Sequence, residues 1–431
     1  MVKVAFVGAG SVEFTRNVVT DLCSFPELSG ELHLALHDIS AERLEYARAL
    51  TERIASQTGT RATISASESR PAALDGADYV INEVQAGGYT ATRRDFDIPA
   101  RYGVRQTIAD TLGIGGIFRG LRTIPVVLGI GRDMLDVCPD ATLLNYSNPM
   151  AMLPWAVYAG TGFERVFGLC HSVRDTHEFL AGLVGVPRGE IDFLTAGFNH
   201  QAFVLRFEHQ GQSLYPRLAA IIDDSPELQR RVRVEIFRRF GYFPTESSEH
   251  SAEYVPWFMR HDDQVEQFRI FVGDYLARSE ENLRELDELT AQLESGQQLD
   301  IEPTSELASE FIHSAETGQH REIYVNVRNG DLISSLPADC CVEVPCDVDA
   351  GGARPRAVGA LPPQLAALNR TFLNVVELTV AAVLEGSREH VYQAALLDPN
   401  TAATLTTAQT IAMCDELLAA HRDLLPPALA T

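Results

Sequence analysis

Lysine is almost absent from this sequence. Among 35 basic residues only Lys3 is a lysine, and the others are arginine. Because Schiff-base chemistry needs a lysine amine, that chemistry is excluded everywhere except at the N-terminus. Basic residues are also few beside the 59 acidic ones, which gives a net charge of -24. This charge opposes binding to nucleic acids and to anionic membranes, so we expect neither as a partner.

Long hydrophobic runs and paired cysteines are missing as well. No uninterrupted apolar run reaches the roughly 18 residues that indicate a transmembrane helix. The first apolar segment, residues 2–7, is too short for the core of a secretion signal and is typical of a buried strand. The seven cysteines are scattered and contain no C-x-x-C pair. We therefore expect a cytoplasmic protein with free thiols.

Apolar strands and amphipathic helices alternate along the first part of the chain. Strands are expected at 2–7, 31–37, 61–66, 79–82, 141–145 and 165–167, and helices at 12–25, 41–57, 118–137, 150–159 and from 172 onward. Such alternation predicts an α/β fold with a Rossmann-like, doubly wound parallel sheet, over residues 1–190. Extended segments then mix with helices, so residues 191–431 are expected to form a second α+β domain.

The turn after the first strand has the sequence Gly8-Ala9-Gly10-Ser11. A strand, a glycine turn and a helix in this order are typical of dinucleotide binding, because backbone N–H groups at the helix start can approach a pyrophosphate. The third glycine of the usual motif is missing. Asp38 ends the second strand, 28 residues after Gly10. A carboxylate there suits the ribose hydroxyls of NAD, although Asp38 could instead cap the next helix.

A thiol and an imidazole stand together at Cys170-His171, between an apolar strand and a helix that we expect Ser172 to cap. This turn lies at the ligand edge of a parallel sheet, and a helix N-terminus stabilises a thiolate. A second histidine, His200, follows 30 residues later. Cysteine and histidine form half of a metal site, but a lone cysteine is equally typical of a small buried residue.

Three further stretches carry unusual chemistry. Residues 93–116 are rich in charge and glycine and are expected to form a long functional loop. Asn148-Pro149 marks a fixed turn after the fifth strand. Residues 246–257 hold three carboxylates, His250 and Tyr254 within a short distance, which favours a site over a plain solvated loop.

Taken together, these motifs resemble the NAD- and manganese-dependent glycosidases of glycoside hydrolase family 4. The resemblance extends from residue 2 to at least residue 346. It rests on Gly8–Ser11, Gln106-Thr107-Ile108, Gly115–Arg119, Asn148-Pro149-Met150, Cys170-His171-Ser172-Val173, Asn199-His200, Ser248-Glu249-His250 and Val342–Cys346. The Cys-His-Ser-Val motif is similar to that of the α-galactosidase branch.

The resemblance implies a fold like that of lactate and malate dehydrogenases and a redox mechanism. NAD, on Gly8, Ala9, Gly10, Ser11 and Asp38, would oxidise the sugar at C3. Mn²⁺ on Cys170 and His200 would bind the sugar oxygens at C2 and C3. Tyr254 would remove the C2 proton, His171 would protonate the leaving group, and Asn148 would hold a sugar hydroxyl. Some members of the family have Asp or Asn in place of His171. Manganese prefers oxygen ligands, so we also expect weak metal retention on a thiolate.

Other functions stay open at this point. Within the family, an α-glucosidase or a 6-phospho-glycosidase is the alternative to an α-galactosidase acting on melibiose-type sugars. A dehydrogenase of the lactate or malate type would accumulate NADH, whereas a hydrolase that recycles its cofactor would not. A non-catalytic NAD sensor would not need Cys170, His200 and residues 246–257 together. A small-molecule sugar is the expected substrate, and we expect a homodimer or homotetramer.

Overall fold

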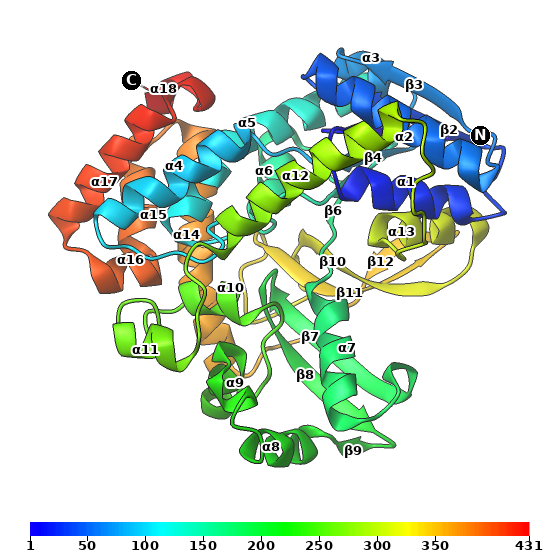
Figure 1. Ribbon diagram of the computed structural model, residues 1–431. Coiled ribbons are helices and arrows are strands. Elements are labelled where there is room, and N and C mark those ends of the chain that lie inside the picture. Colours follow the sequence, from blue (N-terminus) through cyan, green and yellow to red (C-terminus); the bar gives the residue numbers. More distant parts are fainter. Residues whose placement is uncertain (431) are drawn as a thin grey trace.

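The computed structural model describes residues 1–430, in which a single large sheet spans the molecule (Figure 1). The sheet has 12 strands in the order β3-β2-β1-β4-β5-β6-β10-β11-β7-β8-β9, with β12 paired to β11. The first six strands are parallel. They are β1 (Val2–Val7), β2 (Leu32–His37), β3 (Thr63–Ser67), β4 (Tyr79–Asn82), β5 (Thr142–Asn145) and β6 (Val166–Gly168).

Helices cover both faces of this parallel part. They are α1 (Phe14–Ser24), α2 (Ala41–Thr58), α3 (Arg70–Leu74), α4 (Gly88–Arg101), α5 (Gly113–Val137), α6 (Leu153–Thr161) and α7 (Ser172–Val184). Helix α1 packs on α2, while α5 packs on α3, α4 and α6. Strands β1 and β4 are buried along nearly their whole length, as strands with helices on both sides must be. The predicted doubly wound, Rossmann-like fold is confirmed.

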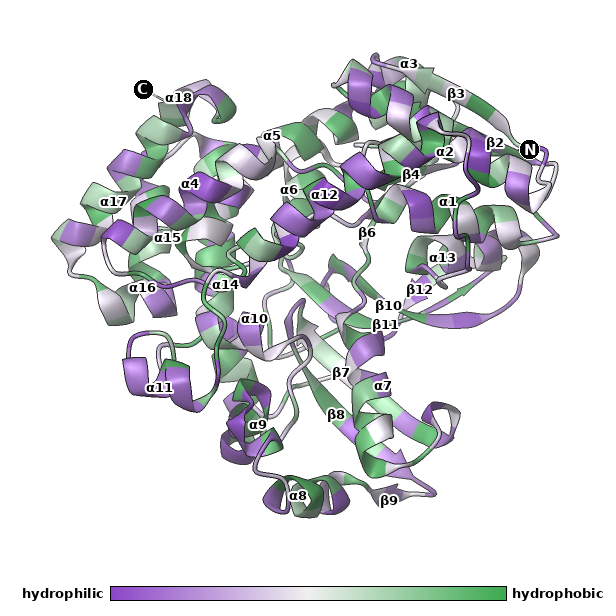
Figure 2. Ribbon diagram, viewed as in Figure 1, coloured by the Kyte–Doolittle hydropathy of each residue, from purple (hydrophilic) through white to green (hydrophobic). Residues whose placement is uncertain are grey.

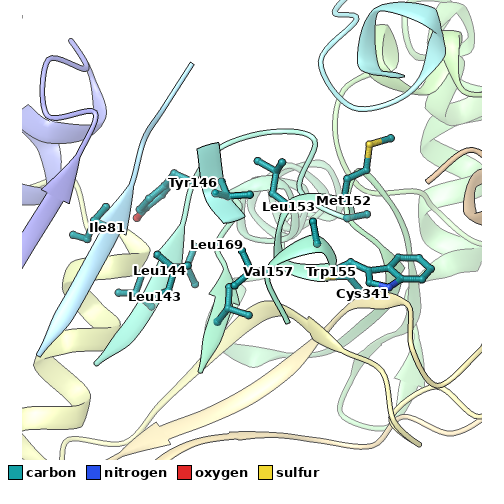
Figure 3. Packing of buried hydrophobic residues seen from close by; sticks show 14 of the residues in the cluster. Ile81, Leu143, Leu144, Tyr146, Met152, Leu153, Trp155, Val157, Leu169 and Cys341 are labelled. Atoms are coloured by element: carbon teal, nitrogen blue, oxygen red, sulfur yellow. The ribbon is translucent and has the colours of Figure 1, made fainter. Parts of the chain in front are cut away.

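The second half of the chain extends the same sheet with antiparallel strands. These are β7 (Ile191–Phe198), β8 (Gln201–His209), β9 (Gln212–Ser213), β10 (Arg321–Arg328), β11 (Cys341–Asp349) and β12 (Gly352–Pro355). Strand β10 joins the two halves by pairing with β6 at Asn326 and Gly168. Figure 3 shows Cys341 of β11 near Trp155 of α6, and both belong to the buried cluster that also includes Leu143 of β5, so one hydrophobic core runs through both halves.

The remaining helices surround these antiparallel strands and form a helical layer beside α5. They are α8 (Tyr215–Asp223), α9 (Val232–Phe240), α10 (Ser248–Glu253), α11 (Asp262–Gln267), α12 (Asp274–Glu294), α13 (Leu307–Thr317), α14 (Pro363–Glu385), α15 (Arg388–Leu397), α16 (Pro399–Thr404), α17 (Thr407–Ala420) and α18 (Pro427–Ala430). Helix α12 crosses the surface, and Figure 2 shows it mostly in hydrophilic colour. Short 3-10 turns lie at Arg188–Glu190, Leu228–Arg230 and Arg422–Leu424.

The prediction of one long loop at 93–116 is wrong. Helix α4 covers its beginning and α5 starts at Gly113, so only residues 102–112 are irregular. Glycines in the first turns of α5 lower its helix propensity, so the sequence pattern predicted a loop there. Packing explains them, because a Cβ on Gly116 would lie 2.7 Å from the carbonyl carbon of Thr111. The glycines therefore let the preceding loop lie directly on the helix.

The predicted cap of α7 is also displaced by one residue. Ser172 is the first residue of the helix, and His171 occupies the N-cap position without a capping hydrogen bond from its side chain. The imidazole is instead bonded to a more distant carboxylate, described below.

Two helices of the described chain, α5 and α14, have the length and composition of a membrane span. Most of the apolar part of α5 is buried inside the protein. Helix α14 packs against α5 and α15. Core helices of globular proteins have the same properties, so these two helices are weak indicators of a membrane.

Candidate functional site

The glycine turn after β1 has the shape expected of a dinucleotide-binding loop. Gly8 has a φ of +87°, and a Cβ there would lie 3.1 Å from backbone atoms of Glu83 and Val84. Only glycine meets both conditions without strain. Helix α1 then starts with no side-chain cap and no acidic residue in its first turn. Its first N–H groups therefore have no side-chain cap, which fits a pyrophosphate at that helix end.

Two carboxyl groups flank this loop. Asp38 ends β2, and its carboxylate accepts hydrogen bonds from the N–H groups of Gly10, at 3.0 Å, and Ser40, at 2.9 Å. The side chain is thus held beside the turn and is partly exposed. Glu83 follows β4 and accepts a hydrogen bond from Thr15 at 2.8 Å. Burial raises the pKa of Glu83 to about 8, so near neutral pH this group adds no full negative charge beside the loop.

Cys170 and His200 meet as predicted, although they come from different elements. Cys170 follows β6, and His200 lies in the tight turn between β7 and β8. The Sγ atom of Cys170 is 3.2 Å from Nε2 of His200. The thiol is partly exposed, whereas His200 is buried. Two soft or borderline donors therefore point to one position.

The other ring nitrogen of His200 has a fixed partner. Thr111 Oγ1 lies 2.8 Å from Nδ1 of His200 and donates its own hydrogen to Asp110 at 2.7 Å. A hydroxyl has one hydrogen, so it must accept from Nδ1–H of the imidazole. In the neutral imidazole the lone pair of His200 is then on Nε2, the atom that faces Cys170. This arrangement of outer partners is typical of a metal-binding histidine.

Further possible metal donors surround this pair. Glu246 lies 3.5 Å from Nε2 of His200 and 3.3 Å from Nδ1 of His250. His250 in turn lies 3.7 Å from Asp110. Two groups could hold a metal ion within the described residues: Cys170 with His200 and Glu246, and Asp110 with His200 and His250.

The charges of this cluster favour a cation at its centre. Burial lowers the pKa of His200, but Cys170 and Glu246 outweigh it and raise that pKa to about 10. Burial also disfavours a charged Asp110, yet the hydrogen bond and charge of His250, with Arg119 and His200, hold its pKa well below its usual range. The cluster is thus built to stabilise positive charge, which a proton or a divalent metal can provide. These donors fit a metal ion.

Two buried carboxyl groups hold the loops that carry the site. Glu253 accepts hydrogen bonds from the backbone N–H groups of residues 107–109, at 2.8, 3.2 and 2.9 Å. Burial outweighs these bonds and raises the pKa of Glu253 to about 7. Glu343 of β11 accepts a hydrogen bond from Asn199 at 3.0 Å, next to His200. The motif around Glu343 therefore supports the turn that presents the histidine.

Tyr254 and Asn148 also reach this cluster. The hydroxyl of Tyr254 is 3.5 Å from Nδ1 of His200, at the end of α10. Burial, followed by the charges of Asp110 and Glu253, raises the pKa of Tyr254 well above its usual value. Asn148, just after β5, donates to Asp110 at 2.9 Å. Tyr254 thus lies beside His200 and Asn148 beside Asp110, and the roles that the family resemblance implies for them stay predictions.

His171 faces a different set of partners. Its Nε2 is 2.8 Å from Glu306, and its ring stacks on Phe14 at the start of α1. Burial opposes protonation, but the hydrogen bond and charge of Glu306 outweigh it and raise the pKa of His171. Glu306 also accepts from the hydroxyl of Tyr146 at 3.1 Å. His171 therefore lies between the glycine turn and residue 306, on the side of the expected cofactor.

Sequence reasoning missed the exact roles of four residues, Asp110, Glu246, Thr111 and Glu306. The first two lie in stretches already marked by their density of polar groups, and that density was the only available signal. Thr111 contacts His200, which is 89 positions away in the chain. Glu306 contacts His171, which is 135 positions away. No spacing rule predicts such contacts.

Comparison with known proteins agrees with this geometry. The Family 4 glycosyl hydrolase model matches residues 3–186, and the model of the Family 4 glycosyl hydrolase C-terminal domain matches residues 195–401. An α-galactosidase of Bacillus subtilis is 40% identical over 99% of both chains. An α-galactosidase of Rhizobium meliloti is 34% identical over 98% of this chain and 89% of its own.

Solved structures show the same fold. A 6-phospho-α-glucosidase from gut microorganisms, in complex with NAD and Mn²⁺, superimposes with a TM-score of 0.81 at 20% identity, covering 99% of both chains. Malate dehydrogenase from Plasmodium falciparum is more distant, with a TM-score of 0.51 at 13% identity over 92% of this chain and 100% of its own. The chain belongs to the family 4 glycosyl hydrolases.

Proposed function

We propose that this family 4 glycosidase hydrolyses unphosphorylated α-galactosides of the melibiose type, with NAD and Mn²⁺ as cofactors. The observation that carries the proposal is the contact of Cys170 and His200 beside Tyr254. The two α-galactosidase relatives, which match nearly the whole chain, support the substrate class. A lactate-type dehydrogenase has no use for an imidazole with a thiol beside one ring nitrogen and a phenol beside the other.

The residues that would hold the cofactors lie at neighbouring strand ends. Residues 8–11 and Asp38 would bind NAD, and Cys170 and His200 would bind the metal. When bound, NAD accepts hydride from the sugar and the divalent cation polarises neighbouring sugar oxygens. A cation beside Tyr254 also opposes the effect of burial on its phenol, which favours the phenolate.

Three side chains would then act on the sugar itself. Tyr254 is the proposed base for the C2 proton, because its hydroxyl lies next to the metal-binding histidine. Asn148 would bind a sugar hydroxyl. His171 is the proposed acid for the leaving group, since Glu306 favours its protonated form. Asp110 is held ionised by its neighbours and so has no proton to give.

An unphosphorylated substrate fits the positions of the arginines. Arg93 pairs with Asp97 at 3.1 Å, and Arg94 donates to the carbonyl oxygen of Ala420 at 2.7 Å. These two arginines, which stand at the start of the charged stretch 93–116, are bonded elsewhere. Asp110 and Glu246 are both held ionised at the site and would repel a dianionic sugar phosphate.

We propose that the protein is a homo-oligomer, a dimer or tetramer, of the cytoplasm. Helix α14 is as apolar as a membrane span, yet less than half of its apolar stretch is buried. Beside it, a surface hollow of about 450 Å³ is lined by Trp257, Leu368 and Leu397, among others. A second copy would cover this face. All seven cysteines are free thiols, which suits a reducing compartment. Light scattering of the purified protein tests the oligomeric state.

The decisive assay uses 4-nitrophenyl α-galactoside with purified protein that has been treated with a chelator and freed of nucleotide. We expect turnover only when both NAD⁺ and Mn²⁺ are restored, without net accumulation of NADH. Full turnover without either one contradicts the proposal. Accumulation of NADH with a 2-hydroxy acid, and no hydrolysis, indicates a dehydrogenase.

A further inference from the structure

The carboxylate of Glu246 lies beside the two predicted metal ligands. Its Oε2 atom is 3.5 Å from Nε2 of His200, the same nitrogen that lies 3.2 Å from the Cys170 thiol. One donor atom from each of the three residues lies within 4.8 Å of the others. This spacing is what a small cation needs to contact three donors at once, since metal–ligand distances are about 2.0–2.3 Å.

The backbone around the site is strained at the residues that face this point. Glu246 has a φ of +69° and His200 a φ of +66°, both in the left-handed region. Ala109, next to Asp110, has a φ of +56°. Such conformations are costly for residues other than glycine, and they persist where the fold must place a side chain for function. Of the six non-glycine residues with positive φ in the described chain, His200 and Glu246 belong to the same group of donors.

Glu246 is also held in place by its neighbours. Its Oε1 atom accepts from the N–H of Ser247 at 3.0 Å and lies 3.3 Å from Nδ1 of His250. These contacts engage one carboxylate oxygen and leave Oε2 directed at His200. Only about 20% of the Glu246 side chain is exposed. A carboxylate that is held by one oxygen and turned to a ligand with the other is typical of metal sites.

We propose that Glu246 is a third protein ligand, so that the metal centre consists of Cys170, His200 and Glu246. This inference rests on the metal requirement of the proposed function. Glu246 supplies a hard, anionic oxygen to a site that otherwise offers sulfur and nitrogen, and manganese prefers oxygen ligands. Three ligands on one side still leave coordination positions for two sugar oxygens.

The other possible set of donors, Asp110 with His200 and His250, is less suited to the same ion. Thr111 connects Asp110 to Nδ1 of His200, so this carboxylate supports the histidine from behind. The second oxygen of Asp110 accepts from Asn148. Asp110 is therefore occupied as a partner of residues that orient the ligands and the sugar.

The test compares Mn²⁺ binding by the wild-type protein, Glu246→Gln and Glu249→Gln, each stripped of metal with a chelator. Glu249 lies in the same segment and its loss changes the charge equally, so it is the matched control. Free Mn²⁺ is measured by electron paramagnetic resonance, without substrate. We expect Glu246→Gln to raise the Kd about 100-fold, the upper end of what outer partners of a metal contribute, and Glu249→Gln to change it about threefold or less.

Two additional measurements separate a direct ligand from a nearby charge. Glu246→Asp keeps the charge but shortens the side chain, so a direct ligand predicts weakened binding for this variant too. In the Co²⁺-loaded variants, the charge-transfer band of the Cys170 thiolate should persist while the ligand-field bands change. NAD binding should be unchanged, which shows that the variants are folded.

The outcomes are distinct. If wild-type protein binds no Mn²⁺, the proposed function itself fails. If wild-type protein binds Mn²⁺ and Glu246→Gln binds it within about tenfold of Glu249→Gln, the third ligand is wrong while the proposed function stands. Unchanged binding in Glu246→Asp together with weak binding in Glu246→Gln also overturns direct ligation, because it shows that charge alone suffices.

Discussion

Tyr254 is the residue whose role can be tested most directly. If its hydroxyl removes the C2 proton, products formed in D₂O should carry deuterium at C2. Tyr254→Phe should abolish this label and lower kcat about 100-fold or more, because it deletes the base. Mass spectrometry and NMR of the released sugar measure both effects. Tyr324→Phe, at a half-buried tyrosine of β10 whose hydroxyl accepts from the N–H of Thr195, serves as the control. Deuterium at C2 in the Tyr254→Phe product would assign the base to another group.

The pair of His171 and Glu306 predicts a dependence on the leaving group. Glu306→Gln removes the charge that raises the pKa of His171. Less of the imidazole is then protonated near neutral pH, and the fall in activity at high pH should move to lower pH. We expect kcat for melibiose to drop about tenfold, and kcat for a dinitrophenyl galactoside, whose leaving group needs no proton, to change little.

The test depends on comparing the change in kcat for melibiose with the change for the dinitrophenyl galactoside. An equal loss for both would mean that Glu306 only supports the fold or the cofactor. An unchanged profile in His171→Asn would move the acid role to another residue, and Asp110 is not that residue because its neighbours hold it ionised.

The sequence alone led to some of these residues and not to others. The residue types of Cys170 and His200 indicated half of a metal site, and the family resemblance then assigned the metal to them. Asn148 and Tyr254 were found by family resemblance. Glu246 stood within a marked stretch, but its contact with His200 depends on how α10 packs against the β7–β8 turn. Packing of this kind is set by the whole fold, so local patterns do not contain it.

At the scale of elements, we expect a substitution in the glycine turn to weaken NAD binding and a substitution of a metal ligand to weaken Mn²⁺ binding, each without changing the other affinity. Gly8→Ala adds a Cβ at a φ of +87°, against backbone atoms 3.1 Å away. This strain of about 1 kcal/mol or more should distort the turn and weaken NAD binding about tenfold, while Mn²⁺ binding stays unchanged. Calorimetric titration with each ligand measures both affinities.

Cys170→Ser and His200→Ala give the reciprocal test. Both should abolish turnover and Mn²⁺ binding but leave NAD affinity near that of the wild-type protein. The NAD turn follows β1, whereas the ligands follow β6 and β7. A loss of NAD affinity as large as the loss of Mn²⁺ affinity would show that the two sites are wrongly assigned.

Asp398, which caps α16, should make stability depend on pH. Its side chain accepts from the N–H of Thr401 at 2.8 Å, and burial raises its pKa from 3.8 to about 6. Above pH 6 the carboxylate is charged in both the folded and the unfolded state, and burial of this charge lowers the stability of the folded state. As pH falls from 6 toward 3.8, the folded state takes up the proton first, so this contribution to the free energy of unfolding increases.

The matched variant is Asp398→Asn, which keeps an oxygen for the cap and cannot titrate. The free energy of unfolding of the wild-type protein minus that of the variant should rise by up to about 3 kcal/mol between pH 7.5 and pH 4. Urea unfolding at several pH values gives this difference and cancels the titration of other groups. A difference that does not change with pH would show that Asp398 is not perturbed by burial.

Elements were predicted well where apolar periodicity determines them, and poorly where packing overrides propensity. The parallel strands and most helices came from their hydrophobic patterns. Helix α4 was missed because its charged residues resemble a loop, and the start of α5 was missed because of its glycines. The continuation of the sheet through β10 and β11 was not foreseen either, since antiparallel pairing across a long insertion leaves no local signal.

At the scale of the whole molecule, one sheet brings distant parts of the chain to a common edge. Residues 107–111, 170–171, 200 and 246–254 come from both halves of the chain, and the polar contacts described above join them. A site assembled in this way depends on the docking of the two halves. The prediction of separate domains over 1–190 and 191–431 therefore stays a proposal.

The charge of the molecule predicts how it selects its substrate. A net charge of -24, together with Asp110 and Glu246 at the site, disfavours a sugar that carries a phosphate dianion. We expect kcat/KM for an α-galactoside to exceed that for its 6-phosphate about 100-fold or more. The α-glucoside should also react poorly, because a site that bonds the axial C4 hydroxyl leaves polar groups unpaired with the epimer.

A competition assay with the α-galactoside, the α-glucoside and their 6-phosphates measures these ratios, and ionic strength identifies their cause. If long-range charge excludes the phosphate, raising the salt from about 0.01 M to 0.15 M shortens the screening length from roughly 30 Å to 8 Å and should narrow the gap between phosphorylated and free sugar. The ratio of galactoside to glucoside involves no charge and should stay constant. Preference for either phosphate would place the enzyme in another branch of its family, and preference for the α-glucoside would make it an α-glucosidase.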